Sequence, residues 1–149
     1  MATVQSILSR KMQQQRPTLV TVERSATVLD AVRLMAEHAI GGVPVRTADG
    51  TIDGIFTERD LLRRVVAAGR DPAATTVADV MTQPVVVGTP ATPLDECASV
   101  MTSRRLRHLP IVDGDQLVGM VTIGDVLALR VAEQEVAIAE LQHYVFDLR

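Results

Sequence analysis

The 149-residue sequence lacks several features that would point to particular functions. It has a single cysteine, Cys97, so an intramolecular disulfide and a zinc site built from several thiolates are both excluded. It has no tryptophan, and its three aromatic residues (Phe56, Tyr144 and Phe146) are too few for the stacking platform of a single-stranded nucleic-acid binder. Its net charge of −3 provides no basic field to attract nucleic acid or an acidic membrane.

Long apolar runs and catalytic patterns are missing as well. No stretch approaches the roughly 18 apolar residues that span a bilayer, and the first residues lack the apolar centre of a secretory signal. No Walker-type loop, catalytic triad or metal-ligand spacing is present. The composition, with 47% hydrophobic and 22% charged residues, is that of a globular protein. These features predict a cytoplasmic protein that is not an enzyme and has no membrane or nucleic-acid partner.

What the sequence does contain is an internal repeat, in which segment 41–62 matches segment 107–127. The offset between the copies falls from 66 residues at Pro44 to 65 at Gly54, so the second copy has lost one residue in a turn, where length changes are best tolerated. Six positions are identical in the two copies: Met35, Pro44, Gly54, Thr57, Asp60 and Leu62 match Met101, Pro110, Gly119, Thr122, Asp125 and Leu127.

Each copy predicts the same order of elements, β-α-β-β-α. Short valine-rich runs predict first strands at Leu19–Val22 and Val85–Val87. Apolar residues at helical spacing predict helices around Val28–Met35 and Leu94–Met101. A hairpin follows in each copy, and a helix begins directly after it. The expected hairpin strands are Val43–Arg46 and Ile52–Phe56 in the first copy, and Leu109–Val112 and Leu117–Val121 in the second.

This order predicts an α/β (α+β) fold in which two repeats pack on each other about a pseudo-twofold axis, because neither repeat alone buries both faces of its sheet. The C-terminal segment predicts one long helix whose apolar stripe, from Val131 to Leu148, fits packing against the body of the protein or against a second copy. We expect a lead-in helix in residues 1–15, repeat 1 in 16–70, a linker in 71–84, repeat 2 in 85–130 and the C-terminal helix in 131–149.

The two strand-to-helix junctions, Gly54–Asp60 and Gly119–Asp125, are the most informative segments. Each places Thr-x-x-Asp at a helix start, which is nearly a capping box, so a structural role accounts for the pattern. A helix start also offers free N–H groups to a phosphate. An ionised Asp60 or Asp125 can in addition accept hydrogen bonds from both hydroxyls of a ribose. The residues alone leave both roles open.

The junction pattern and the apolar-Pro-apolar strand before it (Val43–Val45 and Leu109–Ile111) occur twice in register and resemble the CBS domain. The whole chain resembles a tandem CBS pair, the Bateman module. The resemblance implies a regulatory module, with no required cofactor, that binds an adenosine-containing ligand (AMP, ADP, ATP, NAD or S-adenosylmethionine) between its repeats. It also implies a homodimer that regulates a protein the sequence does not identify. The alternative is an interaction or dimerisation module without a ligand.

The resemblance also assigns site residues. It places the ribose contacts at Asp60 and Asp125, with Thr57 and Thr122 beside them. In the family, backbone near the first strand and near the proline-containing strand frames the adenine. The matching positions here are Val20–Val22 with Gly42, Val43 and Pro44, and Val85–Val87 with His108, Leu109 and Pro110.

The two copies differ in charge. Arg107 replaces Gly41 before the proline-containing strand of the second copy, whereas Arg59 of the first junction is replaced by Gly124. Arginine binds phosphate through paired hydrogen bonds, so we expect the cleft that draws on Arg107 and His108 to hold the more highly phosphorylated ligand, whereas the side of Gly41 and Gly42 offers only backbone amides, helped by Arg59. A solvated arginine cluster is the alternative.

The neighbouring pair Arg63 and Arg64 is expected on an exposed, solvated helix face.

Overall fold

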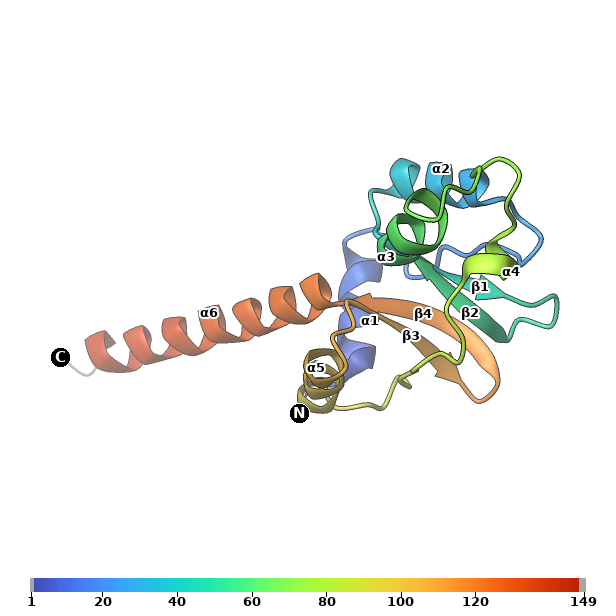
Figure 1. Cartoon of the computed structure of the whole chain (residues 1–149). Coiled ribbons are helices and arrows are strands. Elements are labelled where there is room, and N and C mark those ends of the chain that lie inside the picture. Colours follow the sequence, from blue (N-terminus) through green and yellow to red (C-terminus); the bar gives the residue numbers. More distant parts are fainter. Residues whose placement is uncertain (1, 148–149) are drawn as a thin grey trace.

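The computed structural model describes the backbone of residues 2–147 and the side chains of residues 2–142. Figure 1 shows two small α/β units side by side and a long helix that leaves them. The strands are β1 (Gly42–Arg46), β2 (Ile52–Thr57), β3 (His108–Asp113) and β4 (Gln116–Thr122). The helices are α1 (Val4–Gln13), α2 (Val28–His38), α3 (Glu58–Asp60) with its π-helical continuation (Leu61–Val66), α4 (Val77–Val80), α5 (Leu94–Ser103) and α6 (Ile123–Asp147).

Each repeat contains one antiparallel hairpin, β1-β2 in repeat 1 and β3-β4 in repeat 2. Both turns use a glycine in the left-handed region, with φ of +86° at Gly50 and +60° at Gly114, which residues with a Cβ rarely adopt. The four hairpin strands begin and end within one residue of their expected bounds. The expected α/β fold of two repeats with a C-terminal helix is therefore confirmed.

The first strands expected at Leu19–Val22 and Val85–Val87 are wrong. The first segment forms a single parallel bridge at its end, the second is followed by one at the next residue, and neither continues as a strand. The two bridges join Val22 to Val45 and Gly88 to Ile111.

The prolines of β1 and β3 explain why these bridges do not extend. The carbonyl of Pro44 accepts a hydrogen bond from Val22 at 3.2 Å, so the nitrogen of Pro44 faces the same segment. That nitrogen carries no hydrogen and cannot donate the next bond of a ladder. The carbonyl of Pro110 likewise accepts from the N–H of Gly88 at 2.9 Å. Proline therefore limits each first strand to one bridge.

Two hydrophobic clusters fill the molecule, one in each repeat. The cluster of repeat 1 includes Val77 and Val80 of α4, the helix that follows this repeat in the chain. The cluster of repeat 2 includes Val4, Ile7 and Leu8 of α1. Helix α1 therefore packs on repeat 2, although it precedes repeat 1 in the sequence.

The glycine that opens each junction motif allows these helices to approach closely. A Cβ on Gly54 would lie 2.6 Å from the sulfur of Met81, directly after α4. A Cβ on Gly119 would lie 2.9 Å from Leu8 of α1. Both separations are too short for a real side chain, so these two glycines serve helix packing.

The repeats meet at equivalent positions. Gly50 lies against Gln116, and the backbone N–H of Leu117 donates to the carbonyl of Gly50 at 3.0 Å. Gly42 lies against His108, whose ring would be 3.1 Å from a Cβ at Gly42. Gly42 and Gly50 thus each lie against the residue 66 positions later in the sequence, as expected near a twofold axis.

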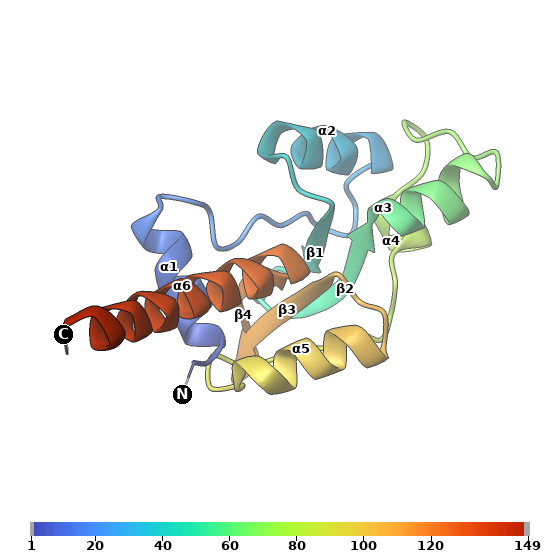
Figure 2. The ribbon, with the colours of Figure 1, turned by 90° about the vertical axis from the view of Figure 1, so that its left-hand side faces the viewer.

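Helix α6 projects from the body of the molecule, as Figures 1 and 2 both show. Near its start, Arg130 forms an ion pair with Asp95 of α5. Val131, Ile138 and Leu141 of the expected stripe are exposed, whereas Leu148 lies outside the described residues. In the part of the chain that the structure describes, no helix is both long and apolar enough to cross a membrane.

Candidate functional site

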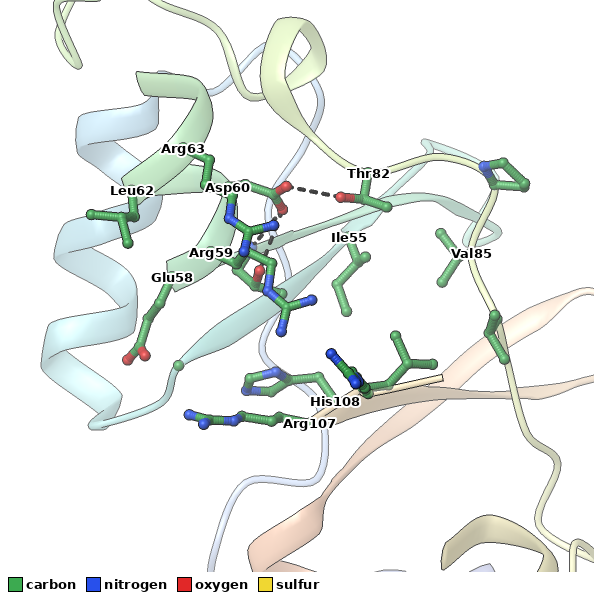
Figure 3. Close-up of a pocket in the computed structure, with 16 residues that line it drawn as sticks. Ile55, Glu58, Arg59, Asp60, Leu62, Arg63, Thr82, Val85, Arg107 and His108 are labelled. Carbon is green, nitrogen blue, oxygen red and sulfur yellow. Dashed lines mark hydrogen bonds between the residues drawn. The ribbon is translucent and has the colours of Figure 1, made fainter. Parts of the chain in front are cut away.

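A cavity of about 400 Å³ lies between the two repeats. One wall is the first junction with α3 and the π-helix, the opposite wall is the segment that enters β3, and the chain after α4 closes one side (Figure 3). The volume is within the range of small-molecule pockets, roughly 300–1,000 Å³. The lining residues are Gly41, Ile55, Thr57, Glu58, Arg59, Asp60, Leu62, Arg63, Thr82, Pro84, Val85, Val86, Arg105, Leu106, Arg107 and His108.

Asp60 lines this cavity with only 4% of its surface exposed. Its Oδ2 accepts the backbone N–H of Thr57 at 3.0 Å, which is one bond of the capping box. Its Oδ1 accepts the hydroxyl of Thr82 at 2.8 Å, and the Nε of Arg64 lies 3.7 Å from the same oxygen. Because a carboxylate has about four acceptor sites, Asp60 can cap the helix and still accept a ligand hydroxyl.

Four arginines give the cavity an excess of positive charge. Arg59 and Arg63 come from α3 and the π-helix, and Arg105 and Arg107 come from the opposite wall. Figure 3 shows Arg59, Arg107 and His108 facing the same open space. Only two acidic side chains line the cavity with them. The arrangement favours an anion that bridges the two repeats.

Apolar side chains form another part of the lining. Ile55 lies on β2, Val85 and Val86 follow the linker, and Leu106 precedes β3. In Figure 3, Ile55 and Val85 lie on the side of the cavity toward Thr82, beyond Asp60. The cavity therefore combines an apolar surface, a buried acceptor and a basic wall.

His108 stands where the two repeats meet. Burial lowers the pKa of its imidazole, the nearby Glu58 opposes this shift, and the positive charge of Arg107 adds to it. The ring is therefore neutral at pH 7, with one nitrogen that donates and one that accepts. Gly41 and Gly42 leave room for this ring, since a Cβ at either would lie within 3.4 Å of it.

The second junction has different surroundings. Asp125 is 5% exposed, and its Oδ2 accepts the backbone N–H of Thr122 at 2.8 Å, as in the first junction. The same oxygen lies 2.6 Å from the Nζ of Lys11, and Oδ1 lies 3.3 Å from Arg16. Burial alone would raise the pKa of Asp125, but the hydrogen bonds from Lys11 and Thr122 outweigh burial and lower it.

Arg107 and His108 belong to repeat 2, but the structure brings them to the junction of repeat 1. Both line the cavity that contains Thr57 and Asp60. The twofold packing explains the difference, because it places the start of β3 against the junction of the other repeat. The sequence predicted two clefts that differ in phosphate binding. In the structure, the arginines, Arg59 included, line one cavity.

Most predicted adenine-framing residues have buried side chains. Val22, Val43 and Leu109 belong to the hydrophobic clusters, Val20 packs against one of them, and Pro44 and Pro110 are buried within their strands. Only the backbone atoms at these positions could contact a ligand. Val87 is 39% exposed and is not among the lining residues, whereas its neighbours Val85 and Val86 are. Gly124 faces open space next to Thr122.

Sequence reasoning missed several residues of the site. Arg63 lines the cavity, and its neighbour Arg64 donates to the carbonyls of Val80 and Met81 at 3.3 and 3.0 Å, so the pair is not simply a solvated surface. Thr82 reaches Asp60 from the linker. The doublet of arginines that begins three residues after the first junction motif was a usable signal, whereas nothing in the linker sequence marked Thr82.

Within the described residues, no group of three or more His, Cys, Asp or Glu side chains is placed to hold a metal ion. Cys97 is fully buried in the cluster of repeat 2, where burial raises the pKa of its thiol. A reactive thiolate is therefore disfavoured at this position.

The fold and the cleft define a two-repeat module of the Bateman type. Models of the CBS domain match the chain twice, over residues 7–67 and 77–132, and the chain therefore belongs to the CBS-domain family. CBS domain-containing protein YhcV of Bacillus subtilis is 34% identical over 127 residues, which cover 84% of this chain and 89% of YhcV. The mitochondrial protein CBSX3 of Arabidopsis thaliana is 37% identical over 123 residues, covering 80% of this chain but only 60% of CBSX3.

Solved structures show the same fold. A protein with CBS domains from Burkholderia ambifaria superposes with a TM-score of 0.81 at 41% identity, covering 89% of this chain and 96% of that one. The CBS domain pair of protein MJ0100, solved with 5′-methylthioadenosine and S-adenosyl-L-methionine, superposes with a TM-score of 0.75. It is 24% identical and covers 89% of this chain and 98% of its own, so this second likeness is one of fold alone.

Proposed function

We propose that the chain is a regulatory module that binds an adenine nucleotide in the cavity between its repeats. One observation carries the proposal: the same cavity holds the Thr57–Asp60 pair, an apolar surface and four arginines. Each part matches one part of a nucleotide. The membership of the CBS family supports a regulatory role, and catalysis has no residues assigned to it.

The three parts of the lining suit a nucleotide that lies across the cleft. The apolar side chains of Ile55 and Val85 offer a surface for the adenine. Asp60 accepts hydrogen bonds from the ribose hydroxyls, as an ionised carboxylate can. Arg59 and Arg107 then bind the phosphates from opposite walls with charge-assisted hydrogen bonds.

The MJ0100 complex supports the choice of an adenosine derivative only to the extent that a CBS pair of this fold holds such ligands. The preference for phosphate comes from this chain, because the arginines line its own cavity. We therefore rank ATP and ADP above AMP, and AMP above adenosine and S-adenosylmethionine.

Ligand binding would act through the contact between repeats. The nucleotide touches the junction of repeat 1, Thr82 of the linker and the start of β3, so it favours the arrangement in which these segments are close together. A partner protein that distinguishes this arrangement would be regulated by the nucleotide. The identity of that partner and a cytoplasmic location stay predictions.

Calorimetric titration of the full chain tests the proposal. Adenosine, AMP, ADP, ATP, NAD and S-adenosylmethionine are compared, and a thermal-shift screen with the same compounds checks stabilisation by mass action. We expect affinity to rise with phosphate number and Asp60→Ala to abolish binding. A flat thermal screen together with absent heats would contradict the proposal.

The exposed apolar residues of α6 favour a second function, self-association. Val131, Val136, Ile138 and Leu141 are exposed large apolar side chains on a helix that projects from the body. We propose that a second copy covers them and that the protein is a homodimer. Light scattering at micromolar concentration is expected to give the dimer mass, and deletion of residues 133–149 to weaken the dimer. A monomeric full-length chain would contradict this proposal.

A further inference from the structure

Lys11 is the only lysine in the sequence, and it is buried. It lies in the last turn of α1 with 7% of its surface exposed. Its ammonium group is 2.6 Å from Oδ2 of Asp125 and donates to the carbonyl of Met120 at 2.8 Å. A lysine is rarely buried unless it is paired, so this contact is a specific feature of the fold.

The partners of Asp125 are those a ligand would need to displace. Oδ2 already accepts the backbone N–H of Thr122 at 2.8 Å, and Oδ1 faces Arg16 at 3.3 Å. Two cations therefore surround this carboxylate. The equivalent Asp60 has a neutral hydroxyl, that of Thr82, at hydrogen-bond distance, and its nearest cation is 3.7 Å away.

We propose that the second cleft is closed by the chain itself. Lys11 takes the place at Asp125 that a ribose hydroxyl takes at Asp60, and Asp125 anchors α1 to repeat 2. The chain then binds one nucleotide, at Asp60. The statement about stoichiometry rests on the proposed function, whereas the closure by Lys11 does not.

Electrostatics favour this closure over ligand entry. A ribose hydroxyl that displaced Lys11 would leave a buried ammonium group without its counter-ion, and a neutral hydrogen bond is weaker than the charge-assisted one that it replaces. Apart from Arg16, which already pairs with Asp125, the second cleft has no counterpart of Arg107 and His108, because the equivalent residues of repeat 1 are Gly41 and Gly42. Neither end of a nucleotide gains enough to expel Lys11.

The single lysine makes closure directly measurable. The full chain, free of nucleotide, is treated briefly with acetic anhydride, and mass spectrometry compares acetylation of Lys11 with that of the N-terminal amine. We expect the ratio of Lys11 acetylation to N-terminal acetylation to be at least tenfold lower in the folded chain than in the same chain unfolded in urea, because the difference in intrinsic basicity between the two amines affects both samples alike. Asp125→Asn is expected to remove this protection, and the matched control Asp60→Asn to keep it. Rapid acetylation of Lys11 in the unmodified sequence would overturn the proposal, whether or not the variants fold.

Calorimetric titration with ATP tests the stoichiometry on the same protein. We expect one site per chain and complete loss of binding in Asp60→Ala. Two sites in the unmodified chain, or a site that survives Asp60→Ala, would overturn the closure. If no nucleotide binds at all, the proposed function fails, and the acetylation rate alone still decides whether Lys11 occupies Asp125.

Discussion

The two strand-to-helix junctions carry the same motif in different surroundings. In both, the aspartate accepts the N–H of the threonine three residues before it, at 3.0 Å for Asp60 and 2.8 Å for Asp125. Beyond this local bond the two differ, since Asp60 lines a cavity and Asp125 pairs with Lys11. The two copies share the cap, and residues far away in the sequence give each copy different surroundings.

The largest expected difference between the two aspartates is in their contribution to the free energy of unfolding. Asp125→Ala leaves the buried ammonium of Lys11 without a counter-ion and is expected to lower the free energy of unfolding by about 3–5 kcal/mol. Asp60→Ala removes a cap and is expected to cost about 0.5–2 kcal/mol. Urea denaturation of both variants measures the difference. Equal losses would mean that the two aspartates play the same structural part.

A second prediction sharpens the assignment of phosphate to the Asp60 cavity. Arg107→Ala removes charge-assisted hydrogen bonds and is expected to weaken ATP binding by about 1.5–3 kcal/mol, with little change for adenosine. The loss should shrink as salt rises, because a partly exposed charge is screened. Titration calorimetry compares the variant with Arg33→Ala, an exposed arginine on α2. Equal losses for ATP and adenosine would assign Arg107 to the fold instead.

A third prediction tests what the two junctions share. Gly54→Ala places a methyl group against Met81 and the carbonyl of Thr82, and Gly119→Ala places one against Leu8. Overpacking of this kind is expected to cost about 1–3 kcal/mol in each variant. Thermal and urea unfolding report the losses. An unchanged stability in either variant would show that its helix shifts without cost.

The smallest effects concern pH. The pKa of His108 is lowered in the folded state, so the unfolded chain binds the proton more readily, and stability is lost as pH falls below about 6.5. The pKa of Asp125 is also lowered, so its contribution persists down to its unfolded value of 3.8 and is lost only as pH falls below it. Denaturation of His108→Gln against the unmodified chain should flatten the first step and leave the second. An unchanged first step would assign it to another group.

Local patterns gave good predictions and long-range contacts did not. The hairpins and helices follow from alternation, helical spacing and turn glycines, all of which are encoded within a few residues. Pro44 has no N–H to donate, but this matters only because Val22 lies beside it in the fold. The sequence therefore predicted a longer first strand than the single bridge that forms. The place of Arg107 depended on how two repeats pack, and the partner of Asp125 could not be inferred from a lysine 114 positions earlier in the chain.

The packing of α1 on repeat 2 has a consequence for synthesis. Lys11 and its acceptor Met120 are 109 residues apart, and a ribosome that adds about 5–20 residues per second separates them by about 5–20 s. Repeat 1 and α4 emerge together in that interval and can assemble at once. Helix α1, with ten residues, is too short to be stable alone. Its apolar face packs against repeat 2, which has not yet been made at that stage. Helix α1 therefore packs in its final position only after the strands of repeat 2 have been made.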